Sequence, residues 1–558
     1  MPAMGQITAG QLLAKALQAE GIDTFFHLLD LERLAHDLTD AGLKAVLVRN
    51  ELAGGMMAHA YSRVTGKPGV VITAAGPGTA NLVPALANAL ADASPVIALG
   101  CSAHLMDRQT ETFQEMDQVR LMEPATKWAA QLTHPHKLAE LVSTGFRRAL
   151  AAPQGPVYID IPADVGEQGP PIDEEEARIP VKYRTESRPL ADPALIGQAV
   201  DLLAGAEKPL IFAGSGVLWS KASQELTGFV DVTGIPFYTT PQARGIIAED
   251  HPRFFGGARS LAFREADVVL VVGTRANIIP TFFRPPRWRQ DVKIITVNLD
   301  PTAMGQNVPV EVGLYGDAKA VLQQLITEAQ GRFGSNETEW VRSLAARNAS
   351  RLEQEAVHQD SSQVPIHPLR LCREVRDFMD RDAILVSDGH STLVFANQSI
   401  PGFVPGHRLT PGPHGTMGVG VPFAIGAQLA EPETQVVLLT GDGAFGWYCI
   451  EVDTAVRNQL PVLFVICNNG GYGAAVEGVD NPQRDLGFTR YDKLMEALGG
   501  HGEFVEQPEE IRPALERAYG SGKPAVVNVK VDQYARASTA AFFTRPGREG
   551  VGDVGWFR

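Results

Sequence analysis

Short runs of β-branched and apolar residues alternate with helical stretches along most of the chain. The runs fall into three groups, between residues 44 and 162, between 208 and 300, and between 383 and 532. Examples are GVVITAA in the first group, DVVLVVG in the second and TQVVLLTGDG in the third. Continuous apolar strands separated by helices are typical of parallel sheets that are covered on both faces. The pattern therefore predicts an α/β protein.

Two polar segments rich in proline and charge separate the three groups, near residues 166–193 and around 333–367. We expect the first part of the second segment to close a helix and its end to be a linker. A length of 558 residues agrees with about three domains. The predicted fold class is α/β, with three doubly wound parallel-sheet domains at 1–170, 190–335 and 365–534 and a tail at 535–558.

Composition narrows the range of partners. The chain is 44% hydrophobic with a net charge of −15, which argues against nucleic acid or an anionic membrane as a partner. No apolar run approaches the roughly 20 residues that cross a bilayer. The start, MPAMGQITAGQLLAKALQAEG, indicates a capped amphipathic helix and not a signal peptide. The four cysteines include no C-x-x-C pair, so we expect reduced thiols and a cytoplasmic protein.

The most informative segment pairs a GDG turn with a later NNGG turn. One apolar strand ends at Gly441, Asp442 and Gly443, and the next ends at Asn468 and Asn469. A helix of about 15 residues is predicted between them. Adjacent parallel strands deliver both turns to the carboxyl edge of the sheet, where ligands bind in open α/β folds.

The residue types at this edge suit a magnesium–diphosphate group. Mg²⁺ takes about six oxygens and usually shares them with phosphate. Asp442 can supply a carboxylate oxygen, Asn469 an amide oxygen and Gly471 a backbone carbonyl. Gly441 and Gly443 allow close approach of the backbone, and the following helix N-terminus favours negative charge. Each turn alone is common, but the pair at this spacing predicts a metal and diphosphate site.

GDG, then 24 residues, then NN resembles the binding motif of the thiamine diphosphate (ThDP)-dependent decarboxylase and carboligase superfamily. The resemblance covers nearly the whole chain. It implies pyrimidine-binding, central and diphosphate-binding domains in that order, with ThDP and Mg²⁺ as cofactors. It also implies that Glu51 of one subunit and Asp442 of another share a site. We therefore expect a homodimer or homotetramer with active sites at the subunit interface.

The resemblance further implies one glutamate that activates the cofactor, placed where an early strand gives way to a helix. Glu51 in KAVLVRNELAGG stands at that place. An apolar pocket favours the protonated form of a carboxyl group, which can then share a proton with N1′ of the aminopyrimidine. The alternative is an exposed first-turn residue that the helix dipole favours.

Other segments resemble cofactor loops of the same family. The resemblance gives Gly415 a carbonyl contact with the 4′-amino group and makes Met417 the wedge that bends the cofactor. Gln114, in TETFQEMDQV, matches a catalytic glutamine that borders the reacting centre. The alternatives without a function are that Met417 is a buried core residue and that Gln114 is an exposed loop residue. The full cofactor-binding set is Glu51, Gly76, Asn81, Gly389, His390, Ser391, Gly415, Met417, Gly441, Asp442, Gly443, Ala444 and Asn469.

The implied activity is that of a ThDP- and Mg²⁺-dependent carbon–carbon lyase or carboligase. Its substrate would be a 2-hydroxy ketone, 2-hydroxyacyl-CoA, aldehyde or 2-keto acid, processed through ylid and enamine intermediates. FQEMDQV resembles acetolactate synthase, GDGAFGWYCIEVDTAVRNQLP resembles benzaldehyde lyase, and the central stretch resembles 2-hydroxyacyl-CoA lyase and oxalyl-CoA decarboxylase. The alternatives are an acetolactate synthase-type 2-keto acid carboligase, a flavin-dependent ThDP oxidase and a catalytically silent ThDP-binding protein.

Three features depart from the family or stay open. FFHLLDLERL replaces the glycine–proline or histidine loop of many relatives, and His27 is not at the matching position. Its neighbours Leu28 and Leu29 predict a dry pocket, which favours uncharged intermediates. AGSGV, with Gly214 and Gly216, is too short a motif to decide whether FAD or ADP binds the central domain.

The C-terminal tail is rich in glycine, arginine and aromatic residues. It is either a flexible exposed tail or a lid over the active-site mouth. As a lid, Arg536, Arg545 or Arg548 would meet an anionic substrate such as a CoA thioester or a carboxylate.

Overall fold

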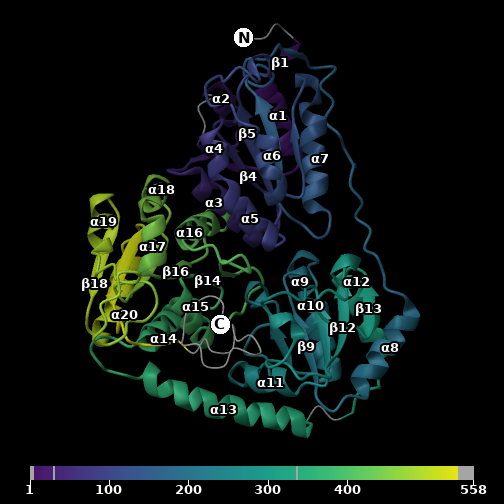
Figure 1. Cartoon of the computed structure of the whole chain (residues 1–558), viewed down its shortest axis with the longest axis vertical. Helices are drawn as coiled ribbons and strands as arrows, with labels where there is room; N and C mark the ends of the chain where they lie inside the picture. The colour runs from purple at the N-terminus through teal and green to yellow at the C-terminus, as the bar shows by residue number, and fades with distance from the viewer. Residues whose placement is uncertain (1–4, 29–31, 335–336, 538–558) are drawn as a thin grey trace.

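The computed structural model describes residues 5–28, 32–334 and 337–537. These residues form three parallel sheets and one short antiparallel pair, β1 (Gln6–Ile7) with β8 (Ile172–Asp173). Figure 1 shows the three sheets in separate bodies, the N-terminal one at the top, the central one at lower right and the C-terminal one at lower left. The predicted fold class, three doubly wound α/β units, is confirmed.

The N-terminal sheet has six strands in the order β3-β2-β4-β5-β7-β6. Its first helix begins at a capping box, in which the Thr8 hydroxyl accepts from Gln11 N and the Gln11 side chain accepts from Thr8 N. The elements are β2 (Thr24–Leu28), β3 (Lys44–Leu47), β4 (Gly69–Thr73), β5 (Val96–Ser102), β6 (Ala129–Gln131), β7 (Val157–Pro162), α1 (Ala9–Ala19), α2 (Glu32–Asp40), α3 (Glu51–Thr65), α4 (Pro77–Asn81), α5 (Val83–Ala91), α6 (Gln118–Met122) and α7 (Leu138–Leu150).

The central sheet has five parallel strands in the order β10-β9-β11-β12-β13. This is a doubly wound arrangement, in which the strand order reverses beside the first strand. The elements are β9 (Pro209–Ala213), β10 (Phe237–Thr239), β11 (Val268–Val272), β12 (Lys293–Asn298), β13 (Val312–Tyr315), α8 (Pro193–Ala204), α9 (Gly216–Trp219), α10 (Ser223–Thr233), α11 (Arg259–Glu265) and α12 (Ala318–Ala329).

The C-terminal sheet has six strands in the order β15-β14-β16-β17-β19-β18. Numbered within their own domains, the N- and C-terminal sheets share one order, 2-1-3-4-6-5. The elements are β14 (Ile384–Asp388), β15 (Arg408–Leu409), β16 (Val436–Gly441), β17 (Leu463–Asn468), β18 (His501–Val505), β19 (Ala525–Lys530), α14 (Pro368–Phe378), α15 (His390–Ser399), α16 (Gly420–Ala430), α17 (Asp442–Trp447), α18 (Val452–Arg457), α19 (Tyr491–Ala497) and α20 (Ile511–Gly520).

Helices α3 and α16 join the N- and C-terminal sheets into one hydrophobic core. That core contains Phe26 and Val71 from one sheet and Val386 and Leu438 from the other. The two helices cross so closely that a Cβ added to Gly426 would lie 2.4 Å from the backbone oxygen of Met57. Only glycine permits this approach, so the sequence of α16 fixes the distance between the two domains.

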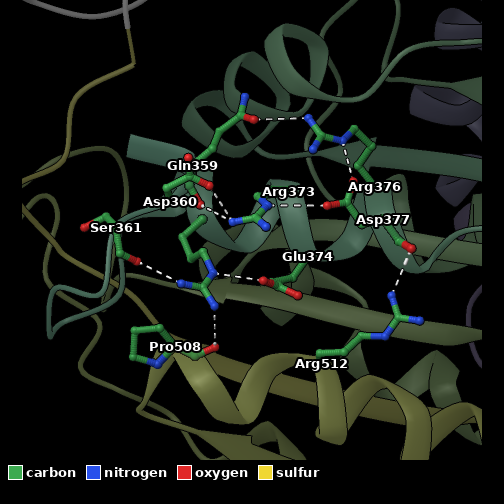
Figure 2. Close-up of polar contacts among 10 residues, drawn as sticks. Gln359, Asp360, Ser361, Arg373, Glu374, Arg376, Asp377, Pro508 and Arg512 are labelled. Carbon is green, nitrogen blue, oxygen red and sulfur yellow. Dashed lines mark hydrogen bonds and ion pairs between the residues drawn. The ribbon is translucent and has the colours of Figure 1, made fainter. Parts of the chain in front are cut away.

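The second polar segment differs from the prediction, because most of it is helical. Helix α13 (Glu339–Gln359) runs along the lower edge of the molecule, from the central domain to the C-terminal one. Figure 2 shows how arginines of α14 hold its end: Arg373 donates to the backbone oxygen of Gln359 and to Asp360, and Arg376 donates to the Gln359 side chain. Cations at a helix C-terminus satisfy its last carbonyl groups. The connection is therefore docked and not a loose linker.

Two other sequence predictions concern the whole chain. None of the four cysteines, all of which lie within the described residues, is joined in a disulfide, and three of them, Cys101, Cys372 and Cys467, are buried. Within the described ranges, no helix has the length and apolar character that crossing a membrane requires.

We predict that Gly426→Ala lowers the free energy of unfolding by about 1–3 kcal/mol, because the added methyl group meets backbone that cannot move aside cheaply. Gly197→Ala in α8 is the matched control, since nothing lies within 4 Å of its added Cβ. This control should be neutral or stabilising by up to about 1 kcal/mol. Urea unfolding of both variants measures the difference. Equal stability of the two would show that the helix crossing tolerates a side chain.

Candidate active site

The GDG and NNGG turns lie side by side at the carboxyl edge of the C-terminal sheet. Strands β16 and β17 pair in parallel, with Gly441 opposite Cys467. Asp442 is the first residue of α17, and Asn469 directly follows β17. The structure therefore brings together the two side chains that the sequence assigned to the metal.

Asp442 is buried without a hydrogen-bond partner. The residue is only 2% exposed, and neither carboxylate oxygen accepts a hydrogen bond of good geometry. Desolvation raises the pKa of Asp442 to about 6, although the nearby N–H groups of Asn469 and Gly443 favour the charged form. A bare buried carboxylate is costly unless a cation meets it. The donor set thus fits Mg²⁺.

The second turn is shaped for the same ion. The Asn469 amide nitrogen donates to the Gly473 carbonyl at 2.8 Å, which turns its amide oxygen away from that bond. Arg484 donates to the Asn469 backbone oxygen at 2.7 Å, and its own backbone oxygen would lie 2.2 Å from a Cβ at Gly471. No described group of three or more His, Cys, Asp or Glu could hold a metal. One carboxylate with amide, carbonyl and phosphate oxygens is the set that this turn offers.

Asp388 ties two further predicted cofactor loops together. It ends β14, is 1% exposed and accepts from the backbone N–H groups of Gly389 at 2.6 Å, Gly418 at 3.0 Å and Gly420 at 2.8 Å. Burial raises the pKa of Asp388 to about 6, and these three N–H groups lower it in part. The loop that contains Met417 is thereby fixed to the start of α15.

The other predicted diphosphate residues lie around these two loops. Gly389 has a positive φ of 81°, and its added Cβ would meet Gly441 N at 3.1 Å, so the α15 and α17 starts touch through glycine backbone. His390 and Ser391 open α15, and Ala444 is buried in α17. Gly415, with φ 69°, and the half-buried Met417 precede α16.

Glu51 lies at the start of α3 in the N-terminal domain. Asn50 caps this helix by accepting from Leu52 N at 2.9 Å, and Glu51 is 8% exposed. The Asn81 amide nitrogen donates to Glu51 Oε2 at 2.9 Å. A Cβ at Gly78 would lie 3.1 Å from Glu51 Oε1, so the absent side chain leaves room for the carboxyl group. The predicted pair Glu51 and Asn81 is thus in direct contact.

Gln114 lies against the glycine turn that follows β4. A Cβ at Gly76 would lie 2.7 Å from the Gln114 backbone oxygen, and both residues have positive φ, 57° for Gly76 and 59° for Gln114. A left-handed glutamine is uncommon and places strain at this position. The structure therefore groups the residues of the predicted pyrimidine half, Glu51, Gly76, Asn81 and Gln114.

Gln118 holds this turn and was missed by the sequence reasoning. Its Oε1 accepts from Gly76 N at 2.5 Å, and its Nε2 donates to Tyr158 Oη at 2.8 Å and to Asp160 Oδ1 at 2.7 Å. Gln118 is 2% exposed. It lies in the FQEMDQV motif, four residues after Gln114, but neither it nor Asp388 carries a spacing that reveals a buried network.

Three expectations differ from the structure or fall outside it. The helix after GDG is not continuous: α17 ends at Trp447, a 3₁₀ turn, η8 (Cys449–Glu451), follows, and α18 completes the connection. His27 is inside β2, with a buried Nδ1 that has no partner, and burial lowers its pKa. Leu29, Arg545 and Arg548 lie outside the described residues, whereas Arg536 is described and exposed.

The fold and the two half-sites define a class of protein, and comparisons with known proteins name it. The chain matches the thiamine pyrophosphate enzyme N-terminal TPP binding domain over residues 7–121, the central domain over 196–325 and the C-terminal TPP binding domain over 389–529. It belongs to the thiamine pyrophosphate enzyme family, and it is a ThDP-dependent enzyme by its membership.

Relatives that match over nearly the full length have names from several branches of the family. The chain is 35% identical to the "Probable acetolactate synthase" of Mycobacterium bovis (strain ATCC BAA-935 / AF2122/97), over 96% of this chain and 98% of the relative. It is 33% identical to the "2-hydroxyacyl-CoA lyase" of Oryza sativa subsp. japonica, with the same coverage. It is 32% identical to the "Oxalyl-CoA decarboxylase" of Escherichia coli (strain K12), over 95% and 96%.

We predict that the Asp442 carboxylate lowers the folding stability of the cofactor-free protein, and that this effect depends on pH. Since the folded-state pKa of about 6 exceeds the unfolded value of 3.8, the folded state holds more protons between these pH values, and stability falls as pH rises through them. At pH 8, Asp442→Asn should therefore be more stable by on the order of 1–3 kcal/mol, and the gain should vanish near pH 4. Differential scanning fluorimetry across pH measures it.

The same variant tests the ion. Added Mg²⁺ and ThDP should raise the melting temperature of the wild type and leave that of Asp442→Asn unchanged. An Asp442→Asn protein that is less stable than wild type at pH 8 would contradict the desolvated carboxylate.

We predict that Gln118→Glu lowers stability by about 2–4 kcal/mol near neutral pH. The variant keeps an oxygen toward Gly76 N but replaces the amide donor with a second carboxyl group beside Asp160. Gln330→Glu at an exposed helix end is the matched control and should be close to neutral. Chemical unfolding at pH 7 and pH 5 measures both, and the deficit should shrink at the lower pH.

Proposed function

We propose that the protein is a ThDP- and Mg²⁺-dependent carbon–carbon lyase or carboligase. Its substrate is a small molecule of the class 2-hydroxyacyl-CoA, 2-hydroxy ketone, aldehyde or 2-keto acid. The observation that carries the metal and diphosphate assignment is the buried, unpartnered carboxylate of Asp442 beside Asn469 and Gly471. The site residues predicted from the sequence, and the domain limits 1–170, 190–335 and 365–534, belong to the same proposal.

The two ends of the cofactor would meet different residues. Asp442, Asn469 and the Gly471 carbonyl would hold Mg²⁺, and the glycine backbone at 389 and 441 would receive the diphosphate. Glu51 would hold a proton against the ring nitrogen N1′, with its Oε2 fixed by Asn81. When bound, ThDP supplies the carbon nucleophile and the electron sink. Gln114, on the strained turn beside Gly76, would border the substrate.

A second copy of the chain would complete each site. Glu51, Asn81 and Gln114 are assembled within the N-terminal domain, and Asp442 and Asn469 within the C-terminal domain. The segment that carries Gln114 exposes the apolar side chains of Met106, at 86%, and Phe113, at 82%. Exposed apolar surface of this kind marks interaction sites. These features support a homodimer, or a tetramer of two such pairs, with sites at the interface.

An acetolactate synthase-type activity on 2-keto acids is the second candidate. The 35% identity to a probable acetolactate synthase over nearly the full length favours it. The CoA-linked activities have comparable support, since two relatives at 33% and 32% identity have names that include CoA. FAD or ADP in the central domain and a cytoplasmic location stay predictions.

A substrate panel tests the proposal. The purified protein with ThDP and Mg²⁺ is offered pyruvate, benzoin, short acyloins, formaldehyde with acyl-CoA, and a 2-hydroxyacyl-CoA, and products are followed by mass spectrometry. We expect turnover with at least one of them and a loss of at least about 100-fold in kcat for Glu51→Ala. Because Glu51 does not contact the diphosphate half, ThDP affinity should change far less than kcat.

Asn81→Ala provides a graded control, because it removes the contact to Glu51 Oε2 and leaves the carboxyl group in place. Its loss in kcat should be smaller than that of Glu51→Ala. Absence of ThDP binding in the presence of Mg²⁺, or full activity of Glu51→Ala, would refute the proposed function.

A further inference from the structure

The loop between β3 and α3, residues 48–50, is held by the C-terminal domain of its own chain. This loop leads directly into Glu51. Its partners are charged residues at the end of η8 and on α18, in the segment EVDTAVR at 451–457. The pyrimidine and diphosphate functions leave these residues unused, so their contacts call for another explanation.

Glu451 makes the central contact. Its Oε1 accepts from the backbone N–H of Arg49 at 2.9 Å, and its Oε2 accepts from the Thr454 hydroxyl at 2.8 Å. Glu451 is 0% exposed. Burial raises its pKa above the ordinary value, while these donors lower it in part. A charge kept here at a desolvation cost is held by specific donors and not by solvent.

Two ion pairs and a carbonyl contact surround this hydrogen bond. Arg49 Nε donates to Asp453 Oδ2 at 2.7 Å, and Arg457 Nε donates to the same oxygen at 2.8 Å. Arg457 Nη2 donates to the Leu47 backbone oxygen at 2.8 Å. The C-terminal domain therefore grips the backbone at 47 and at 49. We call this set, Glu451, Asp453 and Arg457, the loop clamp.

The loop clamp lies close in sequence to the carboxyl group of Glu51. The clamped N–H of Arg49 is two residues before Glu51, and Asn50 between them caps α3. A shift of the loop would move the helix start and with it the Glu51 side chain. Catalytic groups lose activity when they are displaced by as little as about 1 Å. The clamp is a polar support of this loop that comes from the domain carrying Asp442.

We propose that Glu451 is a positioning residue for Glu51: its carboxylate fixes the loop backbone from which the activating glutamate extends. This inference rests on the proposed function, because it assigns a purpose to the position of Glu51. Among the described residues, the Glu451 side chain accepts hydrogen bonds from Arg49 and Thr454, which lie outside the turns at 442 and 469. Its effect should appear in cofactor activation and not in cofactor affinity.

The test uses three variants of Glu451 and one of its partner. Glu451→Ala removes the acceptor of the Arg49 N–H, and Glu451→Asp keeps the charge but shortens the reach by one methylene. Glu451→Gln keeps an oxygen that can accept the same bond. Arg49→Ala is the matched control, because it deletes the half-exposed ion pair with Asp453 and retains the backbone N–H.

Two measurements distinguish positioning from general stability. In the cofactor-free protein, hydrogen–deuterium exchange followed by mass spectrometry reports on the peptide that covers residues 48–56. With ThDP and Mg²⁺ bound, acid quench and NMR report the rate of C2–H exchange of the cofactor. Melting temperature and ThDP affinity are recorded for every variant.

For Glu451→Ala and Glu451→Asp we expect amide exchange at 49–52 to rise by about tenfold and C2–H exchange to slow by about tenfold, the size expected when a hydrogen bond to a charged group is lost. ThDP affinity should stay within about threefold. Arg49→Ala should stay within about twofold of wild type in both measurements. Glu451→Gln should fall between wild type and Glu451→Ala, because its amide oxygen accepts the same hydrogen bond without the charge.

The outcomes separate the two proposals. If Glu51→Ala abolishes C2–H exchange while Glu451→Ala and Glu451→Asp leave it unchanged, the positioning role is wrong and the proposed function stands. If Glu51→Ala leaves the exchange unchanged, the proposed function fails. Should Glu451→Ala not fold, Glu451→Asp decides, since it retains the charge and most of the volume. Equal losses in Glu451→Gln and Glu451→Ala would also overturn the role.

Discussion

The close crossing of α3 and α16 is the contact on which both half-sites depend. Gly426 lets α16 approach the α3 backbone at Met57, and one hydrophobic core then covers the facing sides of two sheets. Helix α3 begins at Glu51, and α16 begins three residues after Met417. The same packing therefore fixes the positions of the Glu51 carboxyl group in the N-terminal domain and of the Met417 side chain in the C-terminal domain.

The polar groups at the two sheet edges have different roles. At the C-terminal edge, desolvation leaves Asp442 without partners, a state that a divalent cation relieves. At the N-terminal edge, Gln118 and Asp160 satisfy one another and hold the glycine turn at Gly76, against which the strained Gln114 lies. The C-terminal edge thus has a carboxylate without a partner, which a cation can bind. The N-terminal edge has a fully hydrogen-bonded network that fixes the glycine turn.

Much of this could be predicted from the sequence, because parallel sheets and strand-end motifs leave local signals. The long apolar strands, the adjacency of Asp442 and Asn469, and Glu51 at a helix start all follow from short segments. The two-residue strand β15 and the three-residue strand β10 carry too little pattern to be predicted. Gln118, Asp388 and Glu451 were missed because each has a partner far away in the sequence: Gly76 lies 42 residues from Gln118, Gly418 lies 30 from Asp388 and Arg49 lies 402 from Glu451. Helix α13 was missed because its surface is mostly polar.

The shared strand order of the outer sheets has a consequence for how the two half-sites are related in space. Helices α3 and α16 both connect the second and third strands of their sheets, so each packs against its own counterpart. A contact between equivalent elements is the arrangement found at a two-fold dimer interface. After the third strand, one sheet has a glycine turn at Gly76 and the other an acid at Asp442, so equivalent edges of the same topology present two chemically unlike surfaces.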